Sequence, residues 1–262
     1  QKKDQPFFLY VPFTAVHLPI RESTTWLDRV PQRIAGVVPR QYAACLLHLD
    51  DAVGRIVKAI ELTGQRENTL IIFTSDNGGS TAENNDTKYP NDDCPNGRLP
   101  GNNLPLRGKK GDLYDGGVRV PTIASWQSKI AAGSKSSTPV HIVDWMPTFC
   151  KLAGAQVESK KLKWDGQDIW TVLSGEEELA PRALYSAGTH FRSQSLRDGD
   201  WKLILFQNKG SEQERAELYN ITKDPSEKTN LASKEPERLQ MMRRTLEAAA
   251  KNDRDSVALP KK

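Results

Sequence analysis

The clearest hydrophobic pattern in the chain lies between Pro39 and Thr63, where apolar residues recur at steps of three and four. This spacing places them on one face of an α-helix, and Gly64 follows as a residue that ends helices. The next apolar run, Leu70 to Thr74, is continuous, which is typical of a strand buried on both faces of a parallel sheet. A helix followed by such a strand predicts an α/β architecture.

Other segments extend this pattern over the first two thirds of the chain. The runs Phe7 to Val11 and Val118 to Trp126 favour strands, whereas His141 to Ala153 and Gln167 to Leu173 favour short helices. Residues 80–104 are rich in Asn, Asp, Pro and Gly and offer little to bury. They therefore predict a long surface loop, and long ordered loops in compact domains are often functional.

The pattern changes from Ala183 onward. Strand-like runs at Ala183 to Ala187 and Ser195 to Phe206 surround a hairpin signal, Asp198-Gly199-Asp200, and Glu217 to Asn220 is a third run. The segment Pro236 to Lys251 has the apolar spacing of an amphipathic helix.

These patterns predict two domains. Residues 1–182 would form an α/β core with a sheet flanked by helices, and residues 183–262 would form a small α+β subdomain with an antiparallel sheet and one helix.

Composition narrows the class of protein. The chain has 262 residues, of which 37% are hydrophobic and 27% are charged, as in a globular protein with a hydrophobic core. No apolar run approaches the roughly 20 residues that span a bilayer, so we expect no membrane partner. The net charge of +4 is too small to indicate nucleic-acid binding. Neither a signal-like apolar segment nor a metal-site spacing of the three cysteines is present in this sequence.

The strand at Leu70 to Thr74 leads directly into Asp76, Asn77 and two glycines. Ligands bind at the carboxyl ends of strands in open α/β sheets, and two oxygen-bearing side chains there suit a hard cation such as Ca²⁺ or Mg²⁺. The alternative is that these residues only make a turn, since Asn and Gly tolerate positive φ.

Two other segments carry candidate chemistry. The stretch Pro105 to Pro121 combines four glycines with four cationic residues, which could cradle an oxyanion or could form a solvated basic loop. His17 lies in the loop after the predicted strand at Phe7 to Val11. Such a histidine could act on a ligand or could be a hydrogen-bonded structural residue.

Six segments occur in a telling order along the chain: FFLYVPFTAVHLP, HLDDAVGRIV, TLIIFTSDNGG, NNLPLRGKKGDLYDGGVRVP, HIVDWMPT and LYNITKDPSEKTNL. Taken together, they resemble the type I sulfatases, which depend on formylglycine and belong to the alkaline-phosphatase-like superfamily. The resemblance covers nearly the whole chain and is closest to the arylsulfatase B branch, which includes N-acetylgalactosamine-4-sulfatases. It implies part of the mixed or parallel sheet of that superfamily, flanked by helices.

The resemblance implies roles for individual residues. Asp76 and Asn77 match the family's metal ligands for one Ca²⁺, and Lys110 matches a lysine that contacts a sulfate oxygen. His17 matches a histidine that contacts the sulfate and protonates the leaving alcohol. These roles suit sulfate-ester cleavage, which needs charge neutralisation on the sulfate oxygens and a proton for a poor leaving group.

The glycine-rich segment offers further charged residues for other tasks. We expect Arg107, Arg119 and Asp115 to brace the glycine loop, and Lys109 to face solvent. The implied substrates are sulfate esters, of sulfated glycans or of aryl alcohols, and the implied location is secreted, periplasmic or lysosomal.

The family's nucleophile, a formylglycine made from Cys or Ser in a C-x-P-x-R motif, is not found here. Cys94 to Arg98 resembles that motif, but its proline is in the wrong position and it follows the metal strand instead of preceding it. We therefore expect this chain to be the C-terminal part of a sulfatase and to be inactive alone. A missing N-terminal segment or chain would supply the formylglycine and the remaining metal ligands.

Two alternatives remain open from the sequence. The parent could be a phosphoester or phosphonate hydrolase of the same superfamily, because these enzymes share metal ligands at strand ends. The chain could also be a catalytically inert fragment or a glycan-binding module.

Overall fold

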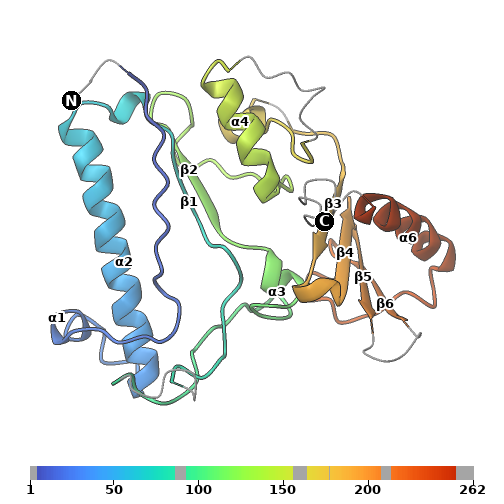
Figure 1. Ribbon diagram of the computed structural model, residues 1–262, viewed down its shortest axis with the longest axis horizontal. Helices are drawn as coiled ribbons and strands as arrows, with labels where there is room; N and C mark the ends of the chain where they lie inside the picture. The colour runs from blue at the N-terminus through green and yellow to red at the C-terminus, as the bar shows by residue number, and fades with distance from the viewer. Residues whose placement is uncertain (1–4, 86–92, 156–163, 177, 208–213, 252–262) are drawn as a thin grey trace, which may run out of the picture. The chain divides into compact units, whose positions relative to one another are not determined.

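The computed structural model divides into two compact units, residues 1–65 with 80–102 and residues 66–79 with 103–262 (Figure 1). The predicted boundary between residues 182 and 183 falls inside the second unit, and that domain division stays a prediction. The residues that the structure describes are 5–85, 93–155, 164–176, 178–207 and 214–251.

The first unit is built on one long helix. Helix α2 (Val37–Leu62) confirms the periodicity, and Gly64, with a φ of 71°, follows its end. A short helix, α1 (Thr24–Leu27), precedes α2. The helix packs Val38 and Cys45 against Ile20 and Leu99 in a small buried cluster.

The loop of the first unit is fastened by a buried asparagine. Asn84 is fully buried, accepts a hydrogen bond of 2.6 Å from the Ile20 amide, and donates to the Ile20 and Pro95 carbonyls at 3.0 Å each. The predicted surface loop over residues 80–104 is irregular where it is described, with one isolated bridge between Glu83 and Arg98. Residues 86–92 of this loop lie outside the described residues.

The prediction of a strand at Phe7 to Val11 is wrong. No strand is assigned there, and the exposed fractions run from 40% at Val11 to 76% at Tyr10. An apolar run becomes a strand only when a neighbouring strand satisfies its backbone, and no strand of the described chain pairs with this one.

The second unit begins with a two-stranded sheet. Strand β1 (Ile71–Thr74) pairs antiparallel with β2 (Thr122–Ser125), and Ile71 lies opposite Ser125. Both predicted strands are confirmed, although β2 is shorter because the residues before it form α3 (Asp115–Val118). The expectation that β1 is buried on both faces is wrong in this chain, because Phe73 is 38% exposed. Among the described residues, no second strand pairs with the other edge of β1.

The short helices predicted at His141 to Ala153 and at Gln167 to Leu173 are confirmed. They are η2 (Ile142–Asp144) with α4 (Trp145–Leu152), and α5 (Trp170–Ser174). A short helix that was not predicted, η1 (Arg66–Asn68), precedes β1. The buried Asp144 carboxylate accepts hydrogen bonds from the His141 amide at 2.7 Å and the Gln167 amide at 3.1 Å, and it pairs with Arg182. One buried carboxylate thus fastens the start of these helices to two later segments.

The C-terminal sheet and helix agree with the prediction of an antiparallel sheet plus one helix. The sheet has the order β3-β4-β5-β6 with every pair antiparallel, and a short turn, η3 (Thr189–Phe191), joins its first two strands. The elements are β3 (Ala183–Ala187), β4 (Ser193–Asp198), β5 (Trp201–Gln207), β6 (Glu214–Asn220) and α6 (Pro236–Ala250).

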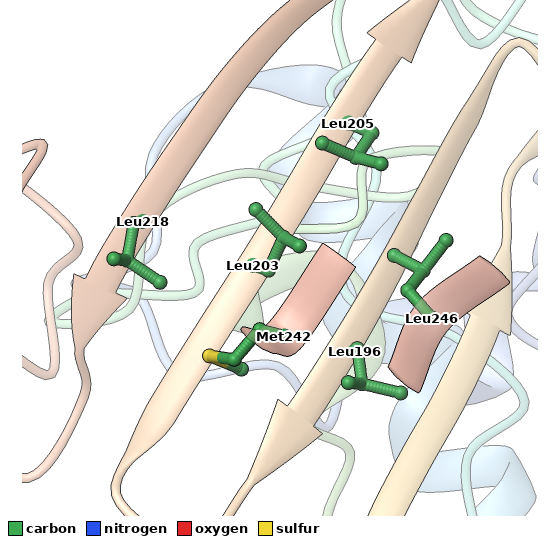
Figure 2. Close-up of a cluster of buried hydrophobic side chains, with 6 residues drawn as sticks. All are labelled: Leu196, Leu203, Leu205, Leu218, Met242 and Leu246. Atoms are coloured by element: carbon green, nitrogen blue, oxygen red, sulfur yellow. The ribbon is translucent and has the colours of Figure 1, made fainter. Parts of the chain in front are cut away.

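The two faces of this sheet have different coverings because side chains alternate along each strand. On one face, Leu203 and its neighbours pack against Met242 and Leu246 of α6 (Figure 2). On the other face, Ile204 and Tyr219 pack against Leu113 and Tyr114 of the glycine-rich segment. The C-terminal sheet therefore directly supports the segment that carries the candidate cations.

Candidate functional site

The end of β1 and the glycine-rich segment are joined by backbone hydrogen bonds. The Gly78 amide donates to the Gly117 carbonyl at 3.0 Å, and the Lys110 amide donates to the Gly79 carbonyl at 3.1 Å. Asn103 fastens the junction, because its side chain accepts from the Gly79 amide at 2.7 Å and donates to the Gly108 carbonyl at 3.0 Å. The backbone around Asp76 and Asn77 and the backbone at Lys110 therefore lie side by side.

Three glycines make this close approach possible. A Cβ atom on Gly78 would lie 1.8 Å from the Gly116 carbonyl oxygen, and one on Gly116 would lie 2.4 Å from the Arg107 carbonyl oxygen. A Cβ on Gly117 would lie 2.2 Å from the Asp112 carbonyl oxygen. No other residue fits at these positions without moving backbone, so the glycines predicted to shape a cradle have a steric reason here.

The two predicted metal ligands present oxygen atoms at the end of β1. Asp76 is exposed, and Asn77 directs its amide nitrogen to the Gly78 carbonyl at 2.9 Å, which leaves its side-chain oxygen for another partner. Carboxylate and amide oxygens suit a hard cation such as Ca²⁺, which takes six to eight oxygen ligands. No cluster of three or more acidic, His or Cys side chains that could hold a metal occurs among the described residues, so these two are at most part of a site.

Lys110 is exposed in the same segment, as is its neighbour Lys109. The Lys109 amide donates to the Asp112 carboxylate at 3.0 Å, and Gly108 and Gly111 adopt positive φ values of 88° and 94° on either side of the two lysines. This tight turn leaves the Lys110 ammonium on the solvent side, where an anion can reach it.

His17 belongs to the first unit and is exposed. Its Nδ1 lies 2.6 Å from the Leu18 carbonyl oxygen, which can only accept a hydrogen bond. Nδ1 therefore carries a proton, and Nε2 is the nitrogen left to give or take one. This arrangement suits an acid or base, and the predicted role of His17 stays a prediction.

Arg107 fastens the glycine-rich segment to the C-terminal sheet. Its guanidinium donates to the Tyr219 hydroxyl at 3.0 Å and to the Glu227 carbonyl at 2.8 Å, and it lies 3.9 Å from the centre of the Tyr114 ring. The hydroxyls of Tyr114 and Tyr219 both donate to the buried Glu217 carboxylate, at 2.7 Å and 2.6 Å. The expected bracing role of Arg107 is confirmed.

The environment of these tyrosines keeps them protonated. Burial, together with the hydrogen bond to the Glu217 carboxylate, raises the pKa of Tyr114 to about 12, and the same two causes raise the pKa of Tyr219. Both phenols therefore stay hydrogen-bond donors at neutral pH.

A buried ion cluster lies behind the segment. Lys202 of β5, which is 3% exposed, places its Nζ 2.7 Å from Asp115 and 2.9 Å from Glu227. The Glu227 carboxylate also accepts from the Asp115 amide at 2.7 Å. The bracing role of Asp115 is thus confirmed, whereas Arg119 contributes only a longer contact of 3.8 Å to Asp115.

The sequence did not single out Lys202, Glu217, Glu227 or Asn103. One signal was present in Trp201 to Phe206, where a single lysine interrupts a hydrophobic strand at an inward-facing position. A lysine there needs a buried acidic partner, although the pattern does not say which one.

The resemblance of Cys94 to Arg98 to the nucleophile motif gains no support from the structure. Arg98 pairs with Glu83 at 3.1 Å on the surface of the first unit. Cys45, expected in the core, is 8% exposed, and burial raises its pKa to about 11. Cys150 lies in α4, as expected, and is partly buried.

Comparison with known families decides the assignment. A family model described as Sulfatase matches residues 1–155. The chain belongs to the sulfatase family. A second model, described as N-sulphoglucosamine sulphohydrolase, C-terminal, matches residues 109–254 of this sulfatase chain. The family resemblance noted in the sequence is confirmed.

Known relatives agree with this assignment. Sulfatase of Formosa agariphila is 34% identical over 261 residues, which cover 90% of this chain and 43% of that protein. Arylsulfatase J of Mus musculus is 29% identical over 276 residues, covering 88% of this chain and 43% of that protein.

The fold also matches a solved structure. The crystal structure of Ps i-CgsB in complex with k-i-k-neocarrahexaose has a TM-score of 0.79 and 31% identity, and the match covers 94% of this chain and 50% of that one. The α/β fold class is confirmed, with antiparallel pairing in both observed sheets. This sulfatase chain thus spans about half the length of the relatives it matches.

Helix α2 is long, but neither it nor any other helix in the described part of the chain is apolar enough to cross a membrane.

Proposed function

We propose that the protein containing this chain hydrolyses sulfate esters and that Asp76, Asn77, Lys110 and His17 take part. The observation that carries the proposal is the hydrogen-bonded junction between the end of β1 and the glycine-rich segment, in a chain of the sulfatase family. That junction joins the exposed Lys110 to Gly79, which lies shortly after the two oxygen-bearing residues Asp76 and Asn77. Such a combination suits a cation and a tetrahedral anion bound together.

Each residue has a task that its chemistry supports. Asp76 and Asn77 would hold a Ca²⁺ ion through their side-chain oxygens, and the bound cation supplies positive charge near the sulfate. Lys110 neutralises a sulfate oxygen, which matters most when charge builds up in the transition state. His17 gives a proton from Nε2 to the leaving alcohol, while its Nδ1 donates to the Leu18 carbonyl and fixes the ring.

The nucleophile and the remaining cation ligands lie outside this chain in our proposal. The formylglycine of the family would come from an N-terminal segment or chain, so these 262 residues alone would be inactive. The proposed substrate class is sulfated glycans. It is supported by Ps i-CgsB, a relative that was crystallised with an oligosaccharide, k-i-k-neocarrahexaose.

The test compares two adjacent lysines in the protein at its full natural length. Lys110→Ala should lower kcat/KM for sulfate esters by at least about 100-fold, the effect of removing one transition-state contact. Lys109→Ala is the matched control, because Lys109 is also exposed, is adjacent to Lys110 and carries the same charge. Equal activity of the two variants would remove Lys110 from the site, and a preference for phosphate esters over sulfate esters would favour a phosphoester hydrolase.

The cation and acid roles need separate measurements. Asp76→Ala should weaken Ca²⁺ binding measured by calorimetry, whereas Asp112→Ala, in the neighbouring segment, should not. His17→Ala should slow esters with poor leaving groups more than esters with good ones, because only poor leaving groups need the proton. A uniform loss across leaving groups would contradict the acid role.

A further inference from the structure

We propose that Lys202, Asp115 and Glu227 form a positioning cluster that sets the conformation of the segment carrying Lys110. Through this cluster, the C-terminal sheet would control anion binding, although none of its three residues touches the anion. Only the last step, from loop conformation to anion affinity, rests on the proposed function of Lys110.

The cluster is buried and closely paired. Lys202, Asp115 and Glu227 are 3%, 3% and 0% exposed, and the ammonium lies within 2.9 Å of both carboxylates. Burial of ionised groups is costly unless each one is paired and hydrogen-bonded. Loss of any one member would therefore change the conformation that the other two prefer.

Glu227 holds the segment at two points that flank Lys110. Its carboxylate accepts the Asp115 amide at 2.7 Å, and its backbone carbonyl accepts the Arg107 guanidinium at 2.8 Å. The adjacent Ser226 hydroxyl donates to the Pro105 carbonyl at 2.7 Å. Residues 226 and 227 thus hold the segment before and after the two lysines.

Asp115 passes this constraint to the site. It begins α3, and the next two residues are Gly116 and Gly117, which pack against the backbone of residues 107–112. Gly117 in turn accepts the hydrogen bond from Gly78 at the end of β1. A shift of Asp115 would therefore move the contact between the segment and the metal-ligand strand.

The cluster is not built for stability alone. It places two carboxylates on one lysine, and the Asp115 Oδ2 atom is buried without a hydrogen-bond partner among the described residues. Glu227 also adopts a φ of 50°, which is unfavourable for a residue with a side chain. Such unsatisfied groups and strained backbone are more common where geometry serves function.

The experiment compares two cations, each paired with a buried carboxylate, in the protein at its full natural length. Lys202→Met removes the cation of the cluster, and Arg182→Met is the matched control because it removes the cation paired with the buried Asp144. Both variants should lower Tm. Only Lys202→Met should speed hydrogen exchange at least tenfold in the peptide covering residues 107–117.

A second variant keeps the test decisive if Lys202→Met does not fold. Glu227→Gln keeps the size of the side chain and an oxygen for the Asp115 amide, so it should raise exchange in the same peptide by a smaller factor, about threefold. Unchanged exchange in both variants would overturn the proposal. An equal rise in Arg182→Met would overturn it as well, because the effect would then be general destabilisation.

The anion step is read from chemical modification of Lys110 with an acetylating reagent, with and without inorganic sulfate. Sulfate should protect Lys110 in the wild type and protect it at least tenfold less in Lys202→Met. Absence of protection in the wild type would contradict the function proposed for Lys110 and leave the loop result standing. Equal protection in both proteins, with faster loop exchange in the variant, would overturn the link between the cluster and anion binding.

Discussion

Replacing Gly78 with alanine tests the junction between β1 and the glycine-rich segment directly. The added Cβ would lie 1.8 Å from the Gly116 carbonyl oxygen, whereas ordinary contacts begin at 3.4 Å, so the two backbones must separate by about 1.6 Å. That movement breaks the hydrogen bond from the Gly78 amide to the Gly117 carbonyl, which is now 3.0 Å long.

The cost of Gly78→Ala has three parts. Overpacking of a tight contact costs about 1–3 kcal/mol. A buried amide without a partner costs about 1–3 kcal/mol. The lower backbone entropy of alanine in the unfolded chain returns about 0.4–1 kcal/mol. We therefore expect a net loss of about 3 kcal/mol in the free energy of unfolding.

Urea denaturation of the protein at its full natural length measures this loss, and Gly54→Ala is the control. Gly54 lies inside α2, and apart from its chain neighbours and the backbone of its own helix no atom lies within 4 Å of the added methyl group. Alanine in a helix interior is favoured over glycine by about 0.5–1 kcal/mol, so the control should gain stability. The two glycine-to-alanine changes should thus have opposite signs.

A loss of less than about 1 kcal/mol for Gly78→Ala would refute the steric reasoning, since it would fall below the smallest overpacking cost. If the loss is that small and the amide of residue 78 exchanges its hydrogen as slowly in the variant as in the wild type, the two backbones do not approach as closely as described.

Three further outcomes follow from buried groups. Leu203→Ala, at a position with 0% exposure beneath α6, should lower the free energy of unfolding by about 3 kcal/mol or more, and a loss below about 1 kcal/mol in urea would contradict the packing. Burial raises the pKa of Tyr114 from 10.0 to about 12, so its contribution to stability is complete below pH 10 and is lost as the pH rises to about 12. Tyr114→Phe should flatten the decline of Tm in that window, whereas Tyr10→Phe, at an exposed site, should leave the decline unchanged. Cys45, whose pKa burial raises to about 11, should alkylate at pH 8 more slowly than Cys150 in the native protein, and the two rates should converge in urea.

The sequence predicted elements whose signal is local. Periodicity identified α2 and α6, and a strand-like run with a turn signal identified β4 and β5. It failed where a property depends on a partner. The apolar run at Phe7 to Val11 describes the environment its side chains favour, but the pattern cannot supply the strand that would pair with it.

The candidate site divides in the same way. Asp76, Asn77 and Lys110 were noticed because of their residue types and neighbours. The structure joins Lys110 by a backbone hydrogen bond to Gly79, which lies shortly after Asn77, and the roles of the three residues remain proposals. The buried ion cluster was missed because its members are far apart in the sequence. Lys202 is 87 residues from Asp115, and Glu227 is 112 residues from Asp115. Pairings at such separations leave no periodic trace in a single sequence.

Side chains of β5 alternate between the two faces of the sheet, and this restricts how the strand can change length in evolution. Leu203 faces α6, and its neighbours Lys202 and Ile204 face the glycine-rich segment. Insertion or deletion of one residue within the strand would exchange the side chains that face α6 with those that face the glycine-rich segment. The lysine ammonium would then point into the hydrophobic core beneath α6, and leucines would point towards the carboxylates. Related sequences in which this strand has a different length should therefore differ by an even number of residues, or carry a β-bulge that restores the alternation of side chains.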